Sequence, residues 1–271
     1  MNIWKKFEIA VRRRETPFHD RVYRIAKNIT RFHVPCIRPL HSVLYHEWLF
    51  RRDLWHSFWR VFYYEPMFKS QCFKVGLGFR MEYAGNGSTR VFGNPKITLG
   101  SNVTIYDNTF FVGLKVFDDP EILIGDNTII GPRVRLMAGK RIEIGSNCLI
   151  ASDLIADNAG HPRDVMDRLG SKGGSPSTEE IQPISIGDFC FFATGTVVYP
   201  GVSIGDGVIA RFGTHIDRHL PPFCLVAGNP IRILKLLPIP PGIEGIVGEK
   251  RYKSYLSAHE NWAPRLSRGR H

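Results

Sequence analysis

A short phrase that returns along the middle of the chain limits the possible folds more than any other feature. It consists of an aliphatic residue, then Gly, then Asp or Ser, and it occurs at Leu99-Gly100-Ser101, Ile124-Gly125-Asp126, Ile144-Gly145-Ser146, Ile186-Gly187-Asp188 and Ile204-Gly205-Asp206. Within these units a large apolar residue recurs every six positions, most clearly at Ile186, Phe192, Val198 and Ile204. A fixed short period is typical of a solenoid, in which each repeat buries its apolar side chain only against neighbouring repeats.

Six residues are enough for one short strand and a turn, so three such units make one triangular coil of 18 residues. The large apolar residue then points inward at the same place in every coil. The Gly-Asp or Gly-Asn pair occupies the corner, where a positive φ costs these residues little. A sandwich of irregular strands does not explain a fixed period of six. We therefore predict an all-β solenoid over residues 91–235.

Two departures from the 18-residue coil show where the solenoid is interrupted. The interval from Ile124 to Ile144 is 20 residues, which places two extra residues in the turn around 138–141. The interval from Ile144 to Ile186 is 42 residues, 24 more than one coil. Because the segment 162–182 has the Gly, Ser and Pro content of a loop, we expect it to be extruded from the solenoid directly after His161.

Residues 1–80 differ in character from the rest of the chain. They hold 16 Lys and Arg against 6 Asp and Glu, and 17 of the 32 aromatic residues. Leu44, Trp48 and Trp55 recur at helical spacing, and we predict a basic, aromatic-rich helical region over residues 1–90. It can cap the solenoid, lie on an anionic membrane surface, or do both. Binding to nucleic acid is the third alternative, but no motif supports it, so we expect no nucleic-acid partner.

Three further features bear on the compartment in which the chain works. No run approaches the roughly 18–20 uncharged apolar residues that a membrane-spanning helix needs. The N-terminal residues include Glu8 and the basic run 12–14 instead of an apolar segment, so we do not expect a secretory signal. The five cysteines are far apart and form no CxxC pair, which argues for a reducing compartment and against both a disulfide framework and a structural zinc site. We expect a cytoplasmic protein, with peripheral contact at the inner face of the membrane as an option.

With these repeats and this loop, the chain resembles a known family, the hexapeptide-repeat acyltransferases with a left-handed β-helix. Within it, the sequence is similar to the galactoside and maltose O-acetyltransferases and to bacterial polysaccharide O-acetyltransferases. The resemblance covers residues 96–235 and is strongest in the segments 156–162, 183–206 and 221–232. Residues 63–72 also look like the helical lead-in of larger bacterial members. The resemblance implies a left-handed winding, whereas most parallel crossovers are right-handed. It also implies a homotrimer with acetyl-coenzyme A in the groove between adjacent β-helices.

Acyl transfer to a sugar hydroxyl needs a base that removes the hydroxyl proton during attack, and a neutral imidazole suits that task. His161 is the candidate catalytic residue, because it stands where the solenoid gives way to the loop and matches the family's histidine in its Gly-His-Pro context. Asp157 and Asp164 are nearby in sequence and are candidates to orient the imidazole or to bind the acceptor. A backbone carbonyl would orient the ring equally well, so this choice stays open.

The cofactor positions come from the resemblance. They are Ala193 and Thr194, whose backbone would face the pantetheine arm, and Arg211 and Phe212, whose backbone would provide a second contact. The guanidinium groups of Arg218 and Arg232 would reach the phosphates of coenzyme A. The alternative is that each arginine is a solvated surface residue that does not contact the cofactor.

The chain departs from the family pattern at three places. Gly131 stands where the galactoside enzymes place an acceptor-binding asparagine, so the identity of the sugar does not transfer. Phe191 replaces a tryptophan, and Ala210-Arg211 replaces the usual Ile-Gly of the last hexad. A zinc site built from His161, His215 and His219 lacks the spacing of the related carbonic anhydrases, so we expect no metal.

The function that follows is acetyl-coenzyme A-dependent O-acetylation of a sugar in a bacterial surface polysaccharide or its precursor. N-acetylation of an amino-nucleotide-sugar and a non-catalytic trimeric scaffold are the alternatives. The basic, aromatic helical region favours a lipid-linked acceptor, because such precursors sit at the membrane. For the tail, residues 236–271, the sequence indicates no function.

Overall fold

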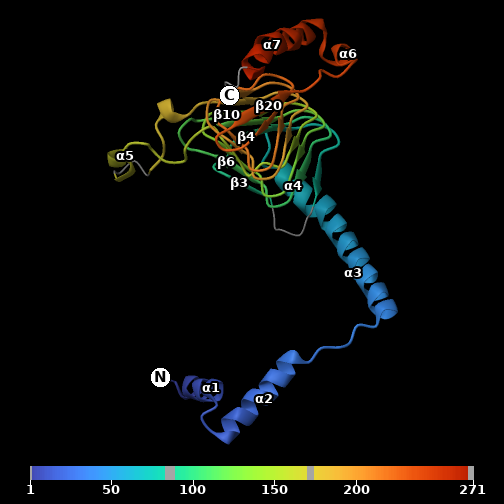
Figure 1. Cartoon of the computed structure of the whole chain (residues 1–271), viewed down its shortest axis with the longest axis vertical. Helices are drawn as coiled ribbons and strands as arrows, with labels where there is room; N and C mark the ends of the chain where they lie inside the picture. The colour runs from blue at the N-terminus through green and yellow to red at the C-terminus, as the bar shows by residue number, and fades with distance from the viewer. Residues whose placement is uncertain (1, 83–88, 170–173, 268–271) are drawn as a thin grey trace. The chain divides into compact units, whose positions relative to one another are not determined.

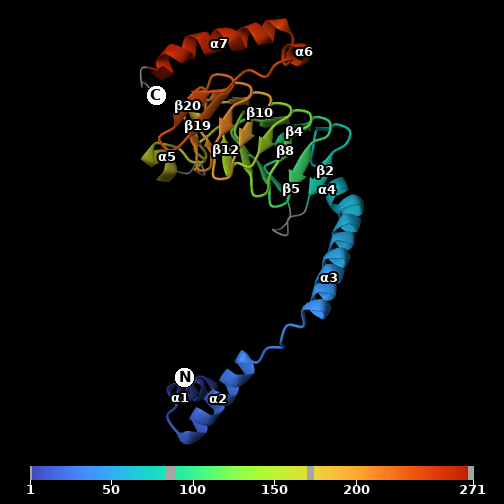
Figure 2. The same cartoon turned by 45° about the vertical axis from the view of Figure 1, so that its right-hand side comes forward.

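The computed structural model describes residues 2–82, 89–169 and 174–267. Most of the chain forms a stack of triangular coils, each of which contributes one strand to each of three sheets (Figures 1 and 2). We name the sheets A, B and C in the order in which the chain passes through them. The edges of the prism are named after the two sheets that they join.

The strands are short, and those within the stack are parallel to their neighbours. Sheet A contains β1 (Lys74–Val75), β4 (Lys96–Leu99), β7 (Glu121–Ile124), β10 (Arg141–Ile144), β13 (Ile184–Ile186) and β16 (Ser203–Ile204). Sheet B contains β2 (Arg80–Glu82), β5 (Thr104–Tyr106), β8 (Ile129–Ile130), β11 (Leu149–Ile150), β14 (Phe191–Phe192), β17 (Ile209–Ala210), β19 (Cys224–Ala227) and β20 (Arg232–Leu236). Sheet C contains β3 (Arg90–Phe92), β6 (Phe110–Gly113), β9 (Arg135–Ala138), β12 (Leu154–Ala156), β15 (Val197–Val198) and β18 (His215–Ile216).

The side chains that recur every six residues fill the interior of this stack. Ile186, Phe192, Val198 and Ile204 are each at most 2% exposed. Equivalent positions of successive coils lie opposite one another, as Ile144 lies opposite Ile186. Burial of each such side chain contributes about 1.5–3 kcal/mol, so the ladder as a whole holds the coils together. The predicted parallel β solenoid is confirmed, while its left-handed winding stays a prediction from the resemblance.

Glycine is needed at the A–B edge for a different reason from the one predicted. Gly125 does not adopt a positive φ, but a Cβ atom on it would lie 2.6 Å from the backbone nitrogen of Ser146 in the next coil. The positive φ falls two residues later, at 54° on Asn127, and recurs at Asn102 and Asn147. The amides of these asparagines form a ladder, with Nδ2–Oδ1 distances of 3.1 and 3.3 Å. Close stacking of the turns therefore requires the glycine, and the asparagine makes the turn.

The β-helix begins earlier than the predicted boundary near residue 90. The strands β1 to β3 form a first coil within residues 74–92, of which 83–88 lie outside the described residues. This coil lacks the repeated phrase, and its inward-facing Val75 is only partly buried. Phe68, from α4 (Glu65–Lys69), stacks on Phe79 with ring centroids 5.6 Å apart and closes this end of the core. An end coil has core neighbours on one side only, which relaxes the sequence pattern.

The C-terminal tail packs on the other end of the stack. The strands β19 and β20 pair antiparallel, and α6 (Glu244–Val247) and α7 (Glu249–Ser267) follow (Figure 2). Arg251 of α7 contacts both Asp206 and Asp188 at 2.7 Å, and Tyr255 donates a hydrogen bond to Asp206. These bonds fix the tail to the A–B edge, apart from residues 268–271, which lie outside the described residues.

Residues 1–55 and 56–271 form two compact units. The first contains α1 (Ile3–Arg13) and α2 (Pro17–Arg31), which contact each other through Phe7 and His19 with ring centroids 5.6 Å apart. The helix α3 (Arg38–Trp59) runs across the boundary and continues as a π-helical turn, Arg60–Tyr64. No side chain in α1, α2 or α3 is buried. Within the described residues, no helix has the length and apolar character required to cross a bilayer.

Candidate active site

His161 lies at the C–A edge, in the connection between β12 and β13. This connection projects from the side of the stack and contains α5 (Val165–Leu169) and a 3₁₀ turn, Thr178–Glu180 (Figure 1). It corresponds to the predicted extruded loop, of which residues 170–173 lie outside the described residues. The imidazole is exposed at the base of the loop, so a substrate can reach it.

A buried asparagine shapes the backbone that leads to His161. Asn158 is 4% exposed, and its side-chain amide donates to the carbonyl oxygen of Met137 in the preceding coil at 3.0 Å. Its Oδ1 accepts a hydrogen bond from the backbone N–H of Gly160 at 2.8 Å. Gly160 has a φ of +78°, a conformation that favours glycine. These hydrogen bonds therefore fix the backbone conformation of residues 158–160, where the chain leaves the coil immediately before His161.

The Nδ1 atom of His161 lies 3.1 Å from the carbonyl oxygen of Gly174. Because a carbonyl oxygen only accepts hydrogen bonds, Nδ1 carries the hydrogen in this contact. In the neutral ring Nε2 then holds the free lone pair, which is the state that a general base needs. Of the orienting groups considered from the sequence, the structure places a backbone carbonyl against the ring.

Asp157 has a structural role instead of the predicted one. Its side chain is fully buried, and its carboxylate accepts hydrogen bonds from the backbone N–H groups of Gly139, Lys140 and Arg141 at 2.6–2.8 Å. The amide of Asn158 adds a fourth donor at 2.8 Å. The carboxylate holds the enlarged turn of the preceding coil and reaches neither the surface nor the imidazole. Its assignment as an acceptor-binding residue is corrected accordingly.

Asp164 and Glu180 hold the loop itself. Asp164 accepts hydrogen bonds from the N–H groups of Met166 and Asp167, at 2.7 and 3.1 Å, and so caps α5. Glu180 accepts from the N–H groups of Arg163 and Ser177, at 2.8 and 3.0 Å, and these bonds lower the pKa of its carboxyl group. The sequence analysis missed Glu180, although the capping-box spacing from Ser177 to Glu180 was a usable signal.

The candidate cofactor residues gather in two places. Ala193 and Thr194 lie at the B–C edge, and Arg211 and Phe212 lie at the same edge one coil further on. The backbone groups here bond mainly to each other, with the N–H of Ala193 donating to Ala210 at 3.0 Å and the carbonyl of Thr194 accepting from Gly213 at 3.2 Å. The Phe212 ring is 78% exposed. Within one chain, sheet C separates this edge from His161.

The two remaining arginines lie elsewhere. Arg218 is exposed at the C–A edge, two coils beyond His161, and its Nε donates to Asp217 at 2.9 Å, which raises the pKa of its guanidinium group. Arg232 is exposed at the start of β20. The structure thus places Arg218 on the edge that carries His161 and Arg232 on the C-terminal hairpin.

The other histidines of the β-helix are hydrogen-bonded to protein groups. His215 Nδ1 lies 3.1 Å from the Tyr199 hydroxyl, and His219 Nδ1 accepts from the N–H of Ser203 at 2.9 Å. Across the described ranges, no three His, Cys, Asp or Glu side chains are grouped so that they could hold a metal ion.

The chain is similar to proteins named as acetyltransferases. It is 32% identical over 114 residues to a Saccharomyces cerevisiae protein with a provisional acetyltransferase name, covering 42% of this chain and 55% of that protein. It is 30% identical over 137 residues to the galactoside O-acetyltransferase of Escherichia coli, covering 50% and 55%. An Escherichia coli protein provisionally named a colanic acid biosynthesis acetyltransferase is 27% identical over 146 residues, covering 54% and 71%. These names confirm the resemblance inferred from the sequence motifs.

The matched region spans about half the length of the first two relatives. No family model matches the chain. Among solved structures, a point mutant of an N-acyltransferase from Bacillus cereus, in complex with dTDP and coenzyme A, superposes with a TM-score of 0.51. The match has 18% identity and covers 72% of this chain and 96% of the other, so it shows a shared fold.

Proposed function

We propose that this chain transfers an acetyl group from acetyl-coenzyme A to a sugar hydroxyl, with His161 as general base. The observation that carries the proposal is the hydrogen bond from His161 Nδ1 to the Gly174 carbonyl, which puts the lone pair of the neutral ring on Nε2, on an exposed loop. Nε2 takes the hydroxyl proton as the sugar oxygen attacks the thioester carbonyl. It returns that proton to the coenzyme A thiolate when the carbon–sulfur bond breaks. A base in this position contributes about 10²–10⁴-fold to the rate.

The acceptor in this proposal is a sugar of a bacterial surface polysaccharide or of its precursor. Two relatives support this class by their names, which refer to a galactoside and to colanic acid biosynthesis. Asp164 is the sequence candidate that stays available for acceptor contact, because it is exposed on the loop that bears His161. Gly131 contributes no side chain, so recognition of the sugar differs from that of the galactoside enzymes.

A homotrimer would complete the site. Four cofactor candidates, Ala193, Thr194, Arg211 and Phe212, lie on a different edge of the prism from His161, so a groove between two chains would bring the two edges together. The outward-facing row of sheet B supports association, because it is apolar over successive coils. Its members are Ile129, Leu149, Phe191, Ile209 and Leu225. Leu149 and Phe191 are 40% and 38% exposed in the single chain. Arg211, Arg218 and Arg232 would then be available for the phosphates of coenzyme A.

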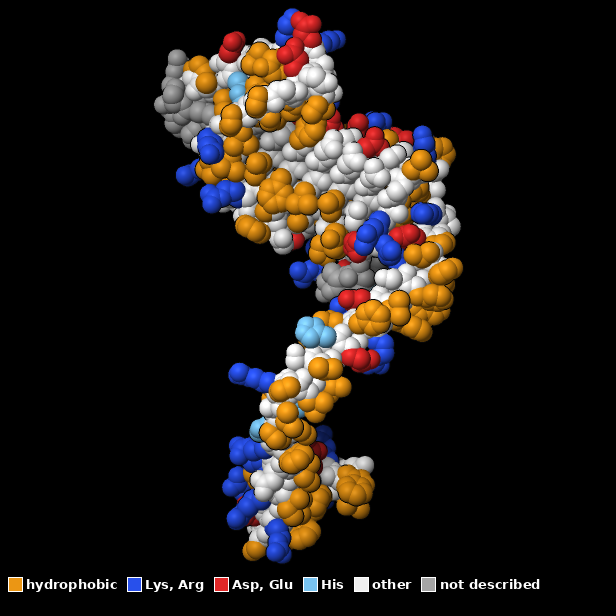
Figure 3. Space-filling model, turned by 90° about the vertical axis from the view of Figure 1, so that its right-hand side faces the viewer, with side chains coloured by type: hydrophobic (Ala, Val, Ile, Leu, Met, Phe, Trp, Pro, Cys, Tyr) orange, Lys and Arg blue, Asp and Glu red, His pale blue; other side chains and the backbone are white. Residues whose placement is uncertain are grey.

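The N-terminal helices would hold the chain at the inner, cytoplasmic face of the membrane, next to lipid-linked acceptors. Apolar side chains of α2 form one exposed stripe that includes Phe18, Ile25 and Ile29. Lys and Arg side chains flank the apolar ones along these helices (Figure 3). An amphipathic helix with basic and aromatic residues binds an anionic interface through both components.

The function is tested with labelled acetyl-coenzyme A and a panel of hydroxy-sugars, amino-sugars, nucleotide sugars and lipid-linked glycans. We expect transfer to hydroxyl groups, and His161→Ala should reduce it by about 10²–10⁴-fold while leaving the fold and oligomeric state unchanged. His33→Ala is the matched control, because His33 Nδ1 also bonds a backbone carbonyl, that of Arg31 at 3.0 Å, outside the β-helix. Full activity of His161→Ala would remove the mechanism. Transfer to amino-sugars alone would favour N-acetylation, and failure to bind coenzyme A would favour a scaffold.

A further inference from the structure

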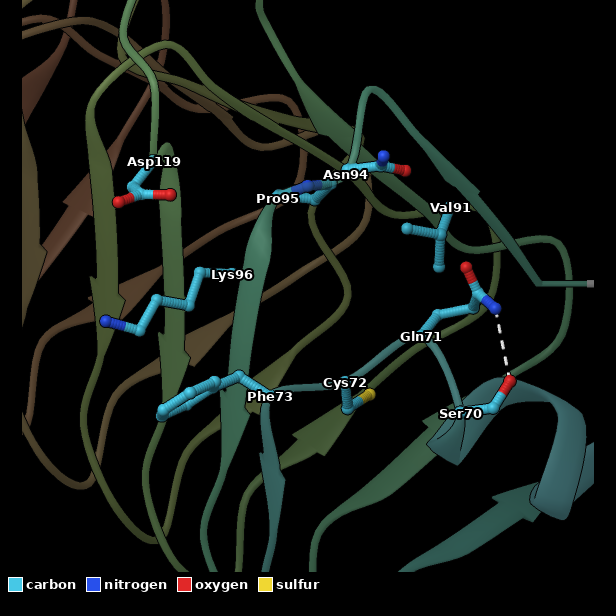
Figure 4. A pocket seen from close by; sticks show the side chains of 9 residues that line it. All are labelled: Ser70, Gln71, Cys72, Phe73, Val91, Asn94, Pro95, Lys96 and Asp119. Atoms are coloured by element: carbon cyan, nitrogen blue, oxygen red, sulfur yellow. Dashed lines mark hydrogen bonds between the residues drawn. The ribbon is translucent and has the colours of Figure 1, made fainter.

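The structure contains a polar pocket at the N-terminal end of the β-helix, away from His161. Its volume is about 580 Å³, and its lining comes from the lead-in before β1, from the strands β3 and β4 with the C–A connection between them, and from the second C–A connection (Figure 4). Lys96, Phe73 and Asp119 lie on one side, and Gln71 and Asn94 lie on the other. The pocket uses the end of the segment 63–72, for which the proposed reaction has no role.

The lining combines hydrogen-bonding groups with one exposed aromatic ring. The amides of Gln71 and Asn94 and the carboxylate of Asp119 provide both donors and acceptors. The Phe73 ring is 71% exposed. A pyranose has the complementary surface, with hydroxyl groups around its rim and an apolar C–H face that packs on an aromatic ring.

The charges of the pocket favour a neutral ligand. Lys96 Nζ lies 3.2 Å from Glu121 Oε1 and 4.8 Å from the Phe73 ring centroid, so the ammonium group is already compensated. The carboxylate of Asp119 disfavours an anionic sugar or a phosphate. Burial raises the pKa of Cys72 to about 12, so its thiol is neutral and is no nucleophile.

The pocket and His161 lie on the same edge of the prism. Asn94 belongs to the first C–A connection, Asp119 to the second, Lys140 to the third and His161 to the fourth. Three strand spacings of about 4.8 Å separate the first connection from the fourth, so these two connections are about 14 Å apart along the edge. An acceptor of several sugar units can span this distance, whereas a monosaccharide cannot.

The edge between the two places is continuous. The N–H of Lys96 donates to the Pro120 carbonyl at 2.7 Å, and the N–H of Glu121 donates to the Lys140 carbonyl at 2.9 Å. Lys140 Nζ lies 5.6 Å from the centroid of the Phe117 ring, so side chains of the second and third connections also meet. These contacts show that the first, second and third connections of the edge stack directly on one another.

We propose that this pocket binds a neutral pyranose unit of the same acceptor whose hydroxyl group reacts at His161, so that the chain acts on an oligosaccharide or polysaccharide. The expected effect on acetyl transfer rests on the proposed transferase function. The expected binding of oligosaccharides to the pocket does not depend on that function. The pocket sets the preferred length of the acceptor, and His161 acts on a unit further along.

Binding is measured first, by calorimetric titration of the full chain with neutral galacto- and gluco-oligosaccharides from monosaccharide to hexasaccharide. We expect saturable binding that strengthens with length. Phe73→Ala and Asn94→Ala should each weaken it by about tenfold, the loss of roughly 1.4 kcal/mol of contact. Leu77→Ala is the matched control, because Leu77 is 86% exposed on the same coil and does not line the pocket.

Acetyl transfer is measured next with the same variants. Phe73→Ala should raise KM for the longest oligosaccharide by about tenfold, with kcat and transfer to monosaccharides unchanged. Absence of oligosaccharide binding, or equal weakening by Leu77→Ala, would overturn the pocket proposal. Binding at the pocket without acetyl transfer to any acceptor would instead count against the proposed function and leave the pocket assignment in place.

Discussion

The helices of residues 3–55 and the coils of residues 74–236 are both rich in apolar side chains, but they use them in opposite ways. In α1, α2 and α3 no side chain is buried, and Trp4 and Phe50 are at least 70% exposed. In the coils after the first, the apolar residues at the inward positions are almost fully buried. Apolar content alone therefore does not make a core, because burial requires a partner surface with the same period.

The two regions therefore differ in what stabilises them. Each coil buries its side chains against the coils above and below, so the stack supplies its own partner surface. Within their own unit the helices leave an apolar stripe exposed, and the partner proposed for it is an anionic membrane interface.

The largest expected difference is in core substitutions. Phe192→Ala removes a ring that is 0% exposed and should lower the free energy of unfolding by about 3–5 kcal/mol. Phe50→Ala removes a ring that is 70% exposed and should change it by less than about 0.5 kcal/mol. Chemical denaturation of both variants measures the contrast. Similar losses for the two would show that the helices pack as firmly as the coils.

Polar groups inside the coils should be nearly as important as apolar ones. Asp157→Ala leaves the N–H groups of Gly139, Lys140 and Arg141 without their acceptor, at a cost of about 2–3 kcal/mol. Asp153→Ala is the control, since Asp153 is exposed and its carboxylate accepts one long bond of 3.4 Å from Gly195. Thermal unfolding of the two variants compares them. Unchanged stability of Asp157→Ala would contradict the structural role assigned to this carboxylate.

A substitution on the apolar stripe should affect lipid binding without affecting the fold. Ile25→Glu places a charge among exposed apolar residues, and binding to vesicles of equal parts phosphatidylcholine and phosphatidylglycerol should fall by about tenfold. Thr30→Glu adds the same charge about 140° around α2 from Ile25, off the apolar stripe, and is the control. Co-sedimentation measures binding. If both variants bind as the wild type does, the helices have another partner.

The smallest effect is expected in the loop that carries His161. Hydrogen bonds lower the pKa of Glu180 in the folded protein, so its contribution to stability is present above its ordinary pKa of 4.5 and is lost as the pH falls through the lowered value. Glu180→Gln should lose this acid dependence. Hydrogen exchange at Arg163 and Ser177, followed from neutral to acid pH, tests it. An identical pH profile for wild type and variant would remove Glu180 as the titrating group.

Much of the solenoid could be predicted because its signal repeats. A single apolar residue such as Ile186 does not predict a fold. The same residue type at every sixth position predicts a β solenoid, because few other architectures have that period. The extruded loop could be predicted from the chain length alone, because the 42 residues from Ile144 to Ile186 exceed the 18 residues of one coil. His161 was located because it adjoins that excess and matches a family motif. The sequence did not predict the first coil, because this coil has core neighbours on one side only. Its inward positions, such as Val75, therefore do not have to repeat the apolar pattern of the later coils.

The roles of the carboxylates near His161 could not be predicted in the same way. Asp157 was a candidate for the site because it precedes His161 by four residues, yet its donors at 139–141 lie 16–18 residues upstream. Such contacts depend on which turns are stacked. The same limit applies to the pocket, whose lining is drawn from residues 70–119.

The coil, its period and the position of the loop follow from the amino-acid sequence, because a repeated inward residue must stack on its counterpart whatever surrounds it. Which polar groups meet across coils, and which positions share an edge, depends on the folded stack. A carboxylate or an amide bonds to the nearest available partner, and in a stack of coils that partner lies one turn away in space and many residues away in the chain.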